Sequence, residues 1–484
     1  MTSLGFQFDN TYLDLPEALY SKLSPVPVTK PEMVILNLPL AIEMGLDFSG
    51  MSPDEQAALF AGNVVPDGAE PLAQAYAGHQ FGHFTILGDG RAIVLGEHVT
   101  PSGQRLDVQF KGSGRTPYSR GGDGRAALGP MLREYVISEA MHALKVPTTR
   151  SLAVVTTGEQ VHRETDLPGA ILTRIGSSHL RVGTFQYAVM QQDKGILESL
   201  VYYTIERHFP SIKRAANKTL SLLEAVLEKQ ADLVAHWMRV GFIHGVMNTD
   251  NVALSGETID YGPCAFMDAF DPGTVFSSID HKGRYAFANQ PSITQWNLAR
   301  FAETLLPILD EDIKHASEIA EQVLRSFGPL YKEKWFSMMR AKLGFTGERE
   351  EDESLVTDLL DWMHGAEADY TNTFRDLTQD EPPQGKPYDD KAFLSWHARW
   401  RERLAQEEND MEASLALMNA SNPAVIPRNH KVEQALDAAT NGDLQPMRDL
   451  LAGLENPYEG RTALTPYQSP PKPEEIVRQT FCGT

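Results

Sequence analysis

The sequence predicts an α+β fold in which a strand-rich N-terminal lobe is followed by a helical C-terminal lobe and a helical extension. Glycine and β-branched residues are dense between about residues 71 and 174, where several short apolar runs have the character of strands. From about residue 220 to residue 451 the apolar residues recur at helical spacing instead. We therefore expect the N-terminal lobe over 1–185, the C-terminal lobe over 186–330 and the extension over 331–484.

The N-terminal lobe is expected to contain strands over 92–95, 106–111 and 170–173, each of them a short apolar run. In the second run apolar and polar residues alternate, which places the two kinds of side chain on opposite faces of the strand. A helix is expected over 131–145, because apolar residues there form one helical stripe and the Gly129-Pro130 pair before it is typical of a break.

The C-terminal part is expected to be mostly helical. A long amphipathic pattern ends at Gly241, a residue type that commonly terminates helices. The polar and β-branched segment 242–260 interrupts the helices, which resume after Thr294 and are broken again at 381–387. The Pro-rich tail 465–473 is expected to run extended over the surface.

The composition excludes several classes of protein. The 484 residues include 43 Lys and Arg against 65 Asp and Glu, so the formal net charge is −22. This acidity argues against a protein that coats nucleic acid, and any anion site must be built locally against the overall field. A content of 42% hydrophobic and 22% charged residues is that of a globular protein and excludes a disordered chain.

The chain is expected to be cytoplasmic and to have no membrane partner. Its first residues resemble neither a secretory signal nor a transit peptide, and no apolar run reaches the ~20 residues of a membrane span. Two cysteines, Cys264 and Cys482, are too few for a disulfide framework or a structural zinc site, which favours a reducing compartment. His79 and His83 have no evident third metal ligand, so a structural role is favoured for them.

Three features of the N-terminal lobe suggest a nucleotide site. A Gly-containing turn at 87–91 offers bare backbone to a phosphate, although an ordinary turn between strands explains the same residues. Lys111 ends its strand, and a surface lysine is its usual interpretation. Glu134 lies on a mostly apolar helix face, where a carboxylate needs a cationic partner or a raised pKa. Lys111 is the natural candidate, because protein kinases use such a pair to orient the lysine on nucleotide phosphates.

A fourth feature lies in the polar segment before residue 263. Protein kinases have a catalytic loop that begins with His and ends with a metal-binding Asn, then a short hairpin, then an Asp-Phe-Gly whose Asp binds Mg²⁺. This chain has the same layout, from His244 to Asn251 and then Asp260-Tyr261-Gly262, with a hairpin expected over 252–254 and 258–259. The layout predicts a protein-kinase-like bilobal fold that binds ATP and a metal.

The catalytic base of a kinase is missing from its usual position. Kinases place this Asp two residues after the His, where the present chain has Val246, and the nearby carboxylate is Asp250, beside the metal-binding Asn. His244 is expected to shape the loop by hydrogen bonding. An ordinary protein-kinase reaction is therefore in doubt, whereas ATP and metal binding are not.

The chain resembles the selenoprotein O family (bacterial YdiU), which are kinase-fold proteins that transfer AMP from ATP to protein hydroxyls. The resemblance covers about residues 70 to 300. The motifs that carry it lie at 76–84, 87–91, 109–125, 132–135, 244–251 and 260–263.

The resemblance implies that ATP lies reversed relative to an ordinary kinase, so that the α-phosphate faces the acceptor. It further implies that the nucleotide is bound by Gly88, Gly90, Arg91, Lys111, Asp123, Gly124, Arg174, Arg181 and Asp260. Glu134 would hold Lys111, Asn251 and Asp260 would bind Mg²⁺ or Mn²⁺, and Asp250 would be the proton acceptor. Without the resemblance, Arg174 is interpreted as a surface ion pair, Arg181 as a loop residue and Asp123 as a turn former.

The C-terminal Phe481-Cys482-Gly483-Thr484 also resembles the family, whose members carry Cys or selenocysteine third from the end. In the family this residue is thought to pair with a cysteine in the loop after the metal-binding aspartate and to regulate activity by redox state. Cys264 is the partner that this chain offers. A buried and inert Cys264 is the alternative.

The expected function is transfer of AMP from ATP to Ser, Thr or Tyr hydroxyls of target proteins (AMPylation), with release of pyrophosphate. Transfer of UMP from UTP (UMPylation) is a variant of this reaction, because the sequence does not report the preferred base. One alternative is a kinase that transfers the γ-phosphate, against which Val246 speaks. The other is a catalytically inactive nucleotide-binding scaffold, or pseudokinase, against which the joint presence of Lys111, Glu134, Asn251 and Asp260 speaks.

Overall fold

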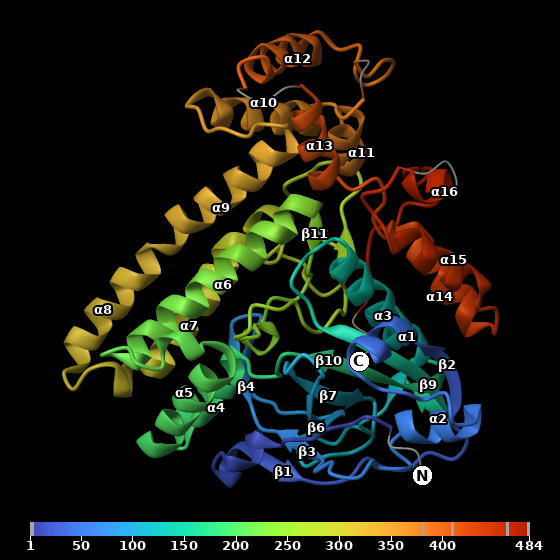
Figure 1. Ribbon diagram of the computed structural model, residues 1–484, viewed down its shortest axis with the longest axis vertical. Helices are drawn as coiled ribbons and strands as arrows, with labels where there is room; N and C mark the ends of the chain where they lie inside the picture. Colours follow the sequence, from blue (N-terminus) through green and yellow to red (C-terminus); the bar gives the residue numbers. More distant parts are fainter. Residues whose placement is uncertain (1–3, 380–381, 408–410, 461–463, 482–484) are drawn as a thin grey trace.

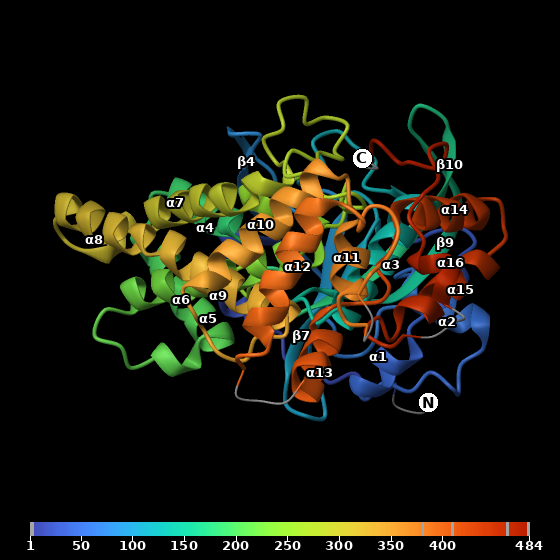
Figure 2. The ribbon, with the colours of Figure 1, turned by 90° about the horizontal axis from the view of Figure 1, so that it is seen from above.

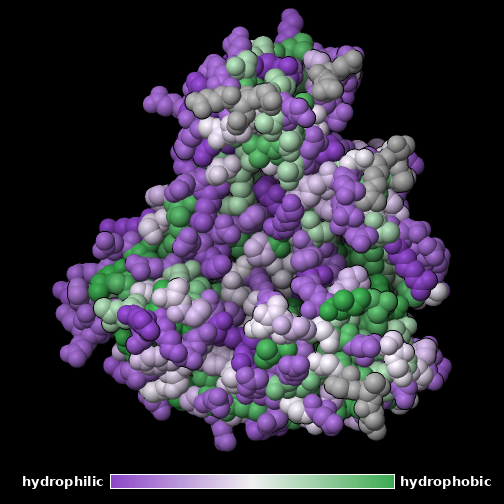
Figure 3. All heavy atoms as spheres, in the orientation of Figure 1, coloured by the Kyte–Doolittle hydropathy of each residue, from purple (hydrophilic) through white to green (hydrophobic). Residues whose placement is uncertain are grey.

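The computed structural model describes residues 4–379, 382–407, 411–460 and 464–481. Figure 1 shows most of the strands gathered in the lower half of the molecule, a layer of long helices beside them, and further helices above and to the right. Hydrophilic side chains cover most of the face seen in Figure 3, as the net charge of −22 leads one to expect. No helix of the described residues is long and apolar enough to cross a membrane.

Within the described residues, the N-terminal lobe is built on an antiparallel eight-stranded sheet with the spatial order β1-β3-β6-β7-β10-β9-β2 and with β8 beside β10. A separate sheet of β4 and β5 is inserted in the chain between β3 and β6. The three predicted strands are confirmed as parts of β6, β7 and β10. The bounds are β1 Tyr20–Lys22, β2 Glu32–Leu36, β3 Leu72–Gln74, β4 Ala77–Gln80, β5 His83–Ile86, β6 Ala92–Val99, β7 Arg105–Lys111, β8 Ala126–Ala127, β9 Arg150–His162 and β10 Asp166–Gly176.

The two faces of this sheet have different partners. α1 (Leu38–Glu43) and α2 (Pro53–Phe60) cover one face, where Val108 and Phe110 of β7 are buried in an apolar cluster. α3 (Leu128–Ala143) packs against β9 and β10 on the other face, which also carries Lys111. The predicted alternation along β7 is thus confirmed, and it directs the strand's lysine toward the helix that carries Glu134.

The helix predicted over 131–145 begins earlier, at Leu128, and ends at Ala143. Gly129 and Pro130 therefore lie in its first turn, and the prediction that they form a break was wrong. Proline is tolerated there because its missing N–H would have no partner within the helix at that position.

The C-terminal lobe is helical, as predicted. Its helices are α4 Val182–Met190, α5 Lys194–His208, α6 Lys218–Val240, α7 Gln290–Leu309, α8 Ile313–Arg325 and α9 Phe327–Lys342. α6 is capped at its start by Asn217, whose side chain accepts a hydrogen bond from the backbone N–H of Leu220. Gly241, in the left-handed conformation (φ 72°), caps its end, which confirms the predicted stop. α7 and α9 pack against α6.

The hairpin predicted over 252–254 and 258–259 does not form. Ala253 instead makes a β-bridge with Arg181, and Thr258 makes one with Thr148. The backbone groups of this segment are thus used by loops of the N-terminal lobe, a partnership between distant parts of the chain that local sequence does not reveal. The short strands β11 (Phe242–Ile243) and β12 (Ala265–Phe266) pair with each other. The chain between them carries Asp250, Asn251 and Asp260.

The extension consists of α10 Glu351–Gly365, α11 Tyr370–Asp376, α12 Lys391–Leu404, α13 Met411–Ser421, α14 Asn429–Thr440, α15 Gln445–Leu454 and α16 Thr465–Gln468. The described residues 382–390 between α11 and α12 are not helical, in agreement with the predicted break. α14 returns to pack against α3 of the first lobe. The tail was predicted to be extended, but 465–468 form the helical turn α16.

The whole is a protein-kinase-like bilobal fold with a helical C-terminal extension, as predicted: an antiparallel sheet with one helix behind it, then a helical lobe. The predicted bounds at residues 185 and 330 stay predictions. One large apolar core runs from Tyr12 in the first lobe to Leu464 in the extension, while the extension also has its own aromatic cluster around Trp396 and Trp400.

Candidate active site

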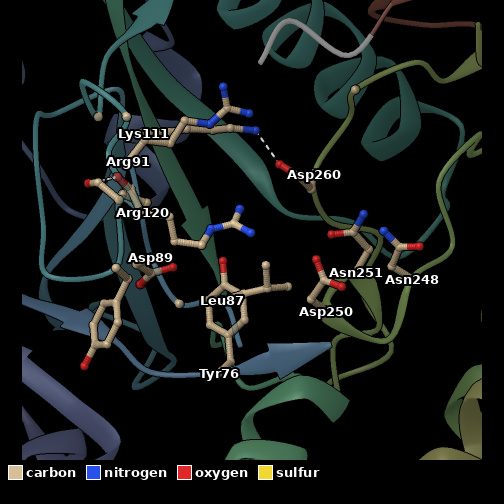
Figure 4. A pocket seen from close by; sticks show the side chains of 18 of the residues that line it. Tyr76, Leu87, Asp89, Arg91, Lys111, Arg120, Asn248, Asp250, Asn251 and Asp260 are labelled. Carbon is tan, nitrogen blue, oxygen red and sulfur yellow. Dashed lines mark hydrogen bonds and ion pairs between the residues drawn. The ribbon is translucent and has the colours of Figure 1, made fainter. Parts of the chain in front are cut away.

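A cavity of about 340 Å³ lies between the sheet of the N-terminal lobe and the loops that follow β11. Its walls include the turn 87–91, the end of β7, the loop 118–125 and the segment 246–251. Figure 4 shows Lys111 and Arg91 on one side of this cavity and Asp250, Asn251 and Asp260 on the other. Every nucleotide, metal and proton-acceptor residue implied by the resemblance lines it.

The glycines of the turn 87–91 are required by the packing around them. Gly88 has φ +108°, and a Cβ on it would lie 2.4 Å from the ring of Tyr118. A Cβ on Gly90 would lie 2.8 Å from the carbonyl oxygen of Tyr118. The loop that carries Tyr118 is fastened to the turn by Thr116, whose hydroxyl donates to the carbonyl of Asp89 at 2.7 Å. The turn is therefore a wall of the cavity, held in shape by a second loop.

Lys111 and Glu134 form the predicted pair. The Nζ of Lys111 lies 2.7 Å from Oε2 of Glu134, whose residue is only 1% exposed. Arg174 donates from Nε to the other carboxylate oxygen of Glu134 at 2.6 Å. Burial alone would raise the pKa of Glu134, but Arg174 and Lys111 outweigh it, and the pKa lies below its ordinary value.

Asp260 completes this cluster from the opposite wall. Its Oδ1 accepts from Nζ of Lys111 and, at 3.1 Å, from the guanidinium of Arg174. Burial opposes ionisation of Asp260, yet Lys111 and Arg174 hold its pKa well below the usual value. Two cations and two carboxylates thus balance each other. The interpretation of Arg174 as a surface residue was wrong, since it is 3% exposed.

Arg181 is likewise buried, at 5% exposure, which overturns its interpretation as an ordinary loop residue. Its guanidinium stacks over the ring of Tyr76 at 4.3 Å and donates to the backbone carbonyl of Asp250 at 3.2 Å. Asp89 lies 3.9 Å from the same guanidinium. Arg181 therefore joins the turn 87–91 to the loop that carries Asp250.

Asp250 lies in a single turn of 3-10 helix, Thr249–Asn251, and is 8% exposed. Its Oδ1 is buried and has no hydrogen-bond partner within the described part of the chain. Burial raises the pKa of Asp250 from 3.8 to about 6. Gly78 of β4 packs directly against this carboxylate, because a Cβ on it would lie 2.3 Å from Oδ1. A partly buried carboxylate with an unused oxygen is suited to accept a proton.

Asn251 and Asp260 fit a magnesium site by the chemistry of their donors. The side-chain nitrogen of Asn251 donates to the carbonyl of Val246 at 3.0 Å, so its amide oxygen remains available as a ligand. Amide and carboxylate oxygens suit Mg²⁺, which usually takes one or two protein carboxylates together with phosphates and water. A site of this kind has few protein ligands. The described residues accordingly hold no group of three or more His, Cys, Asp and Glu able to bind a metal.

Two of the histidines, His79 and His244, have the structural roles predicted for them, whereas the structural role of His83 stays a prediction. The Nε2 of His244 lies 3.0 Å from the carbonyl of Ile259, and the backbone N–H of His244 donates to Gln290 at 3.0 Å. His244 therefore joins the segment 244–251, here called the catalytic segment because it corresponds to the catalytic loop of kinases, to the residue before Asp260. His79 is paired with Gln186 at 2.7 Å and His83 is exposed.

Asp123 and Gly124 lie at the rim of the cavity. The carboxylate of Asp123 accepts from Arg163 at 2.9 and 3.2 Å and from the backbone N–H of Arg125 at 2.9 Å. The last bond makes Asp123 a turn former as well, as its sequence context indicated. Gly124 has φ +69° and its position leaves no room for a side chain, since a Cβ would lie 2.1 Å from the carbonyl oxygen of Gly114.

Sequence reasoning missed several residues of the cavity wall. They are Tyr76, Gln80, Asn248, Arg120 and Arg163. Four of these lie inside motifs that carried the family resemblance, namely Tyr76, Gln80, Arg120 and Asn248, and that was the available signal. Arg163, from the turn between β9 and β10, reaches the rim through tertiary structure alone.

The fold and the site define a kinase-like protein whose cavity has the residues to bind a nucleotide and a divalent metal. The family model described as "Protein adenylyltransferase SelO" matches residues 2–455. A relative from Alcanivorax borkumensis, "Protein nucleotidyltransferase YdiU", is 60% identical over 484 residues and covers 100% of both chains. A relative of the same name from Nitrosococcus oceani is 59% identical over 482 residues, covering 99% of this chain and 98% of its own.

The chain belongs to the SelO protein adenylyltransferase family. The predicted resemblance is confirmed, and so is the predicted class, a protein nucleotidyltransferase. Among solved structures, "ROP2 from Toxoplasma gondii: A virulence factor with a protein- kinase fold and no enzymatic activity" is 10% identical and covers 70% of this chain and 88% of its own, with a TM-score of 0.23. So low a score lends no support to the fold or to an activity.

Proposed function

We propose that this protein transfers AMP from ATP to a Ser, Thr or Tyr hydroxyl of a target protein and releases pyrophosphate. The observation that carries the proposal is the carboxylate of Asp250, which lines the same cavity as Lys111, Arg174 and Asp260. A proton acceptor and a set of phosphate-binding cations therefore border one space. Nucleotidyl transfer requires both, because catalysis consists mainly of positioning and charge stabilisation.

Asp250 is the proposed proton acceptor. With a pKa of about 6 it is ionised at neutral pH and able to take the proton of the attacking hydroxyl. The hydroxyl oxygen then forms a bond to the α-phosphorus as the bond from that phosphorus to the pyrophosphate oxygen breaks. Arg181 keeps the loop of Asp250 in place by its bond to the Asp250 carbonyl.

Lys111, Arg174 and Arg181 are the proposed phosphate ligands, with Arg91 and the turn glycines Gly88 and Gly90 on the same wall. Glu134 holds Lys111 and Arg174 in fixed positions through short charged hydrogen bonds. Asp123 and Gly124 are proposed to contact the nucleotide at the rim.

Asn251 and Asp260 are the proposed ligands of Mg²⁺, with Mn²⁺ able to replace it because both ions favour oxygen ligands. When bound, the metal neutralises phosphate charge and polarises the transferred phosphorus.

We also infer a cytoplasmic location from the acidic composition and from the presence of only two cysteines. Use of UTP and the reversed orientation of the nucleotide belong to the proposal and are tested with it.

The test is to incubate the protein with Mg²⁺ and ATP labelled separately at the α- and γ-phosphorus and to follow the label into protein. Asp260→Ala and Asp250→Asn are compared with the exposed Asp437→Asn as a matched control. We expect α-label in the native and control proteins and none in the two site variants. Label from the γ position alone would make the protein a kinase, and no label despite measurable ATP binding would make it a scaffold. The same assay with α-labelled UTP tests UMPylation.

A further inference from the structure

A group of aromatic and arginine side chains lies outside the cavity, on the face of the β4–β5 hairpin that is turned away from Asp250. It comprises Phe84, Ile86, Trp296, Arg284 and Arg300, here called the aromatic–arginine surface. His79 of β4 joins its parts, because its ring lies 5.1 Å from that of Phe84 and 5.4 Å from that of Trp296. The guanidinium groups of Arg284 and Arg300 lie over the Trp296 ring, at 4.8 and 5.1 Å.

This surface is joined to the catalytic segment through the hairpin backbone. The N–H of His79 donates to the hydroxyl of Thr249 at 2.7 Å, and the N–H of Phe81 donates to the side-chain oxygen of Asn248 at 3.0 Å. The hydroxyl of Tyr285, next to Arg284, donates to the same oxygen at 2.7 Å. Figure 2 shows the hairpin and the loop before α7 projecting from the same side of the molecule. The surface therefore borders the segment that carries Asp250.

Large apolar side chains are exposed on this hairpin. Phe84 is 45% exposed and Ile86 is 52% exposed, and the two lie on one face of β5 because they are two residues apart. The two side chains offer adjacent apolar surface to a partner. Aromatic residues and arginine are also the types that dominate the binding energy of protein interfaces.

The charge of the surface indicates the chemistry of the partner. Arg284 makes no ion pair with any residue that the structure describes, and its Nε is buried without a hydrogen-bond partner. Arg300, by contrast, is paired with Glu303. An arginine without a carboxylate partner carries a positive charge that a docked protein can balance. It favours a partner that brings a carboxylate, since complementary charge selects partners and fixes their register.

We propose that the aromatic–arginine surface docks the protein that receives the nucleotide. The docked segment presents a carboxylate to Arg284 and apolar side chains to Phe84 and Ile86, close in sequence to the modified hydroxyl. This inference rests on the proposed function, because it assigns the acceptor of that reaction. The acceptor is the occupant that the structure favours, because the backbone of the hairpin that carries the surface also bonds to Asn248 and Thr249, next to Asp250.

The test uses three short synthetic peptides of equal length, each with one tyrosine and with leucines at the same positions. The other residues beside the tyrosine are Asp in the first peptide, Asn in the second and Lys in the third. Binding is measured by fluorescence anisotropy on the full-length protein, so that no catalytic step is needed. We expect the Asp peptide to bind about tenfold more tightly than the Asn peptide, the effect of one charged hydrogen bond.

The variants Arg284→Ala and Phe84→Ala test the two parts of the surface. Arg284→Ala should remove the preference for Asp, and Arg284→Glu should transfer it to the Lys peptide, a gain that a misfolded variant would not show. Phe84→Ala should weaken all three peptides by about tenfold. Arg325→Ala, which removes an exposed arginine of α8, is the matched control and should change nothing.

Equal affinity for the Asp and Asn peptides, no binding of any peptide, or no effect of Arg284→Ala would overturn the proposal. Self-association of the native protein that Phe84→Ala abolishes would overturn it too, because a second copy would then occupy the surface. A KM for the Asp peptide that rises in Arg284→Ala at an unchanged KM for ATP would support it. If peptide binding depends on Arg284 but no α-label is transferred to any protein, the proposed function alone is refuted. If label is transferred equally well by the native protein and by Arg284→Ala, the docking surface alone is refuted.

Discussion

Replacing Asp250 by Asn is expected to abolish transfer and, at the same time, to stabilise the protein at neutral pH. The reason is the burial of this carboxylate, which is 8% exposed and leaves Oδ1 without a partner among the described residues. Burial disfavours the charged form and raises the pKa from 3.8 to about 6. The proposed base, which must be ionised to accept a proton, therefore lies in a place that resists ionisation.

The size of the effect follows from linkage between protonation and folding. Because the folded state binds this proton more tightly than the unfolded state, ionisation of Asp250 costs stability as the pH rises from 3.8 to about 6. The penalty is absent below that window and complete above it. A shift of roughly two pH units at ~1.4 kcal/mol each gives about 3 kcal/mol. Asparagine has the same shape and never ionises, so the variant escapes the penalty.

The assay is urea unfolding of the native protein and Asp250→Asn at about pH 4 and about pH 8, in EDTA and without nucleotide. At about pH 4 the variant and the native protein should have nearly the same free energy of unfolding. At about pH 8 the free energy of unfolding of the variant should be larger by about 3 kcal/mol. Asp437→Asn, which alters an exposed carboxylate, should show no such trend. A native protein as stable as Asp250→Asn at both pH values would refute the reasoning, as would transfer reduced by less than about a hundredfold.

Two further predictions concern buried groups. Glu134→Gln leaves the two cations of the cluster with a single carboxylate. The free energy of unfolding in urea should therefore fall by about 3 kcal/mol, and transfer should be lost. A fall of less than about 1 kcal/mol would mean that Asp260 alone balances the cations. Cys264 is fully buried and its pKa is raised to about 12, so in the reduced protein its thiol should react with Ellman's reagent only after unfolding. Because the chain has two cysteines, rapid reaction of both thiols in the native protein would contradict this.

Much of the active site was predictable because its motifs are local. The pairing of Lys111 with Glu134 followed from the faces of one strand and one helix together with the kinase layout, and it is confirmed at 2.7 Å. The burial of Arg174 and Arg181 did not follow from local sequence, since an arginine at a strand end or in a loop is usually exposed. What buries Arg181 is the ring of Tyr76, which approaches it only in the folded chain.

The errors in the fold have the same origin. The segments 252–254 and 258–259 have the residues of a hairpin, but loops of the other lobe bind their backbone groups, as the bridges to Arg181 and Thr148 show. The pairing of Cys264 with Cys482 stays a prediction, because Cys482 lies outside the described residues. The tail does come close to Cys264, since the hydroxyl of Thr480 donates to the carbonyl of Pro263 at 2.6 Å.

The roles proposed for Lys111, Arg174 and Asp260 also predict that nucleotide binding is coupled to metal binding. Asp260 shares its Oδ1 between Lys111 and Arg174, so a metal must compete with these two cations for the same carboxylate. Phosphate groups that bind Lys111 and Arg174 remove this competition, because they take over the charge that Asp260 now balances. Binding of the two ligands must therefore be mutually favourable, and the coupling must be equal in both directions.

Calorimetry measures this coupling without any turnover. The affinity for Mn²⁺ should rise at least about fivefold when a non-hydrolysable ATP analogue saturates the site, and the affinity for the analogue should rise by the same factor with the metal present. Asp260→Asn should reduce the coupling, because an amide neither balances the cations nor binds the metal as a carboxylate does. Equal metal affinity with and without the analogue would mean that Asp260 is not the group for which the metal and the cations compete.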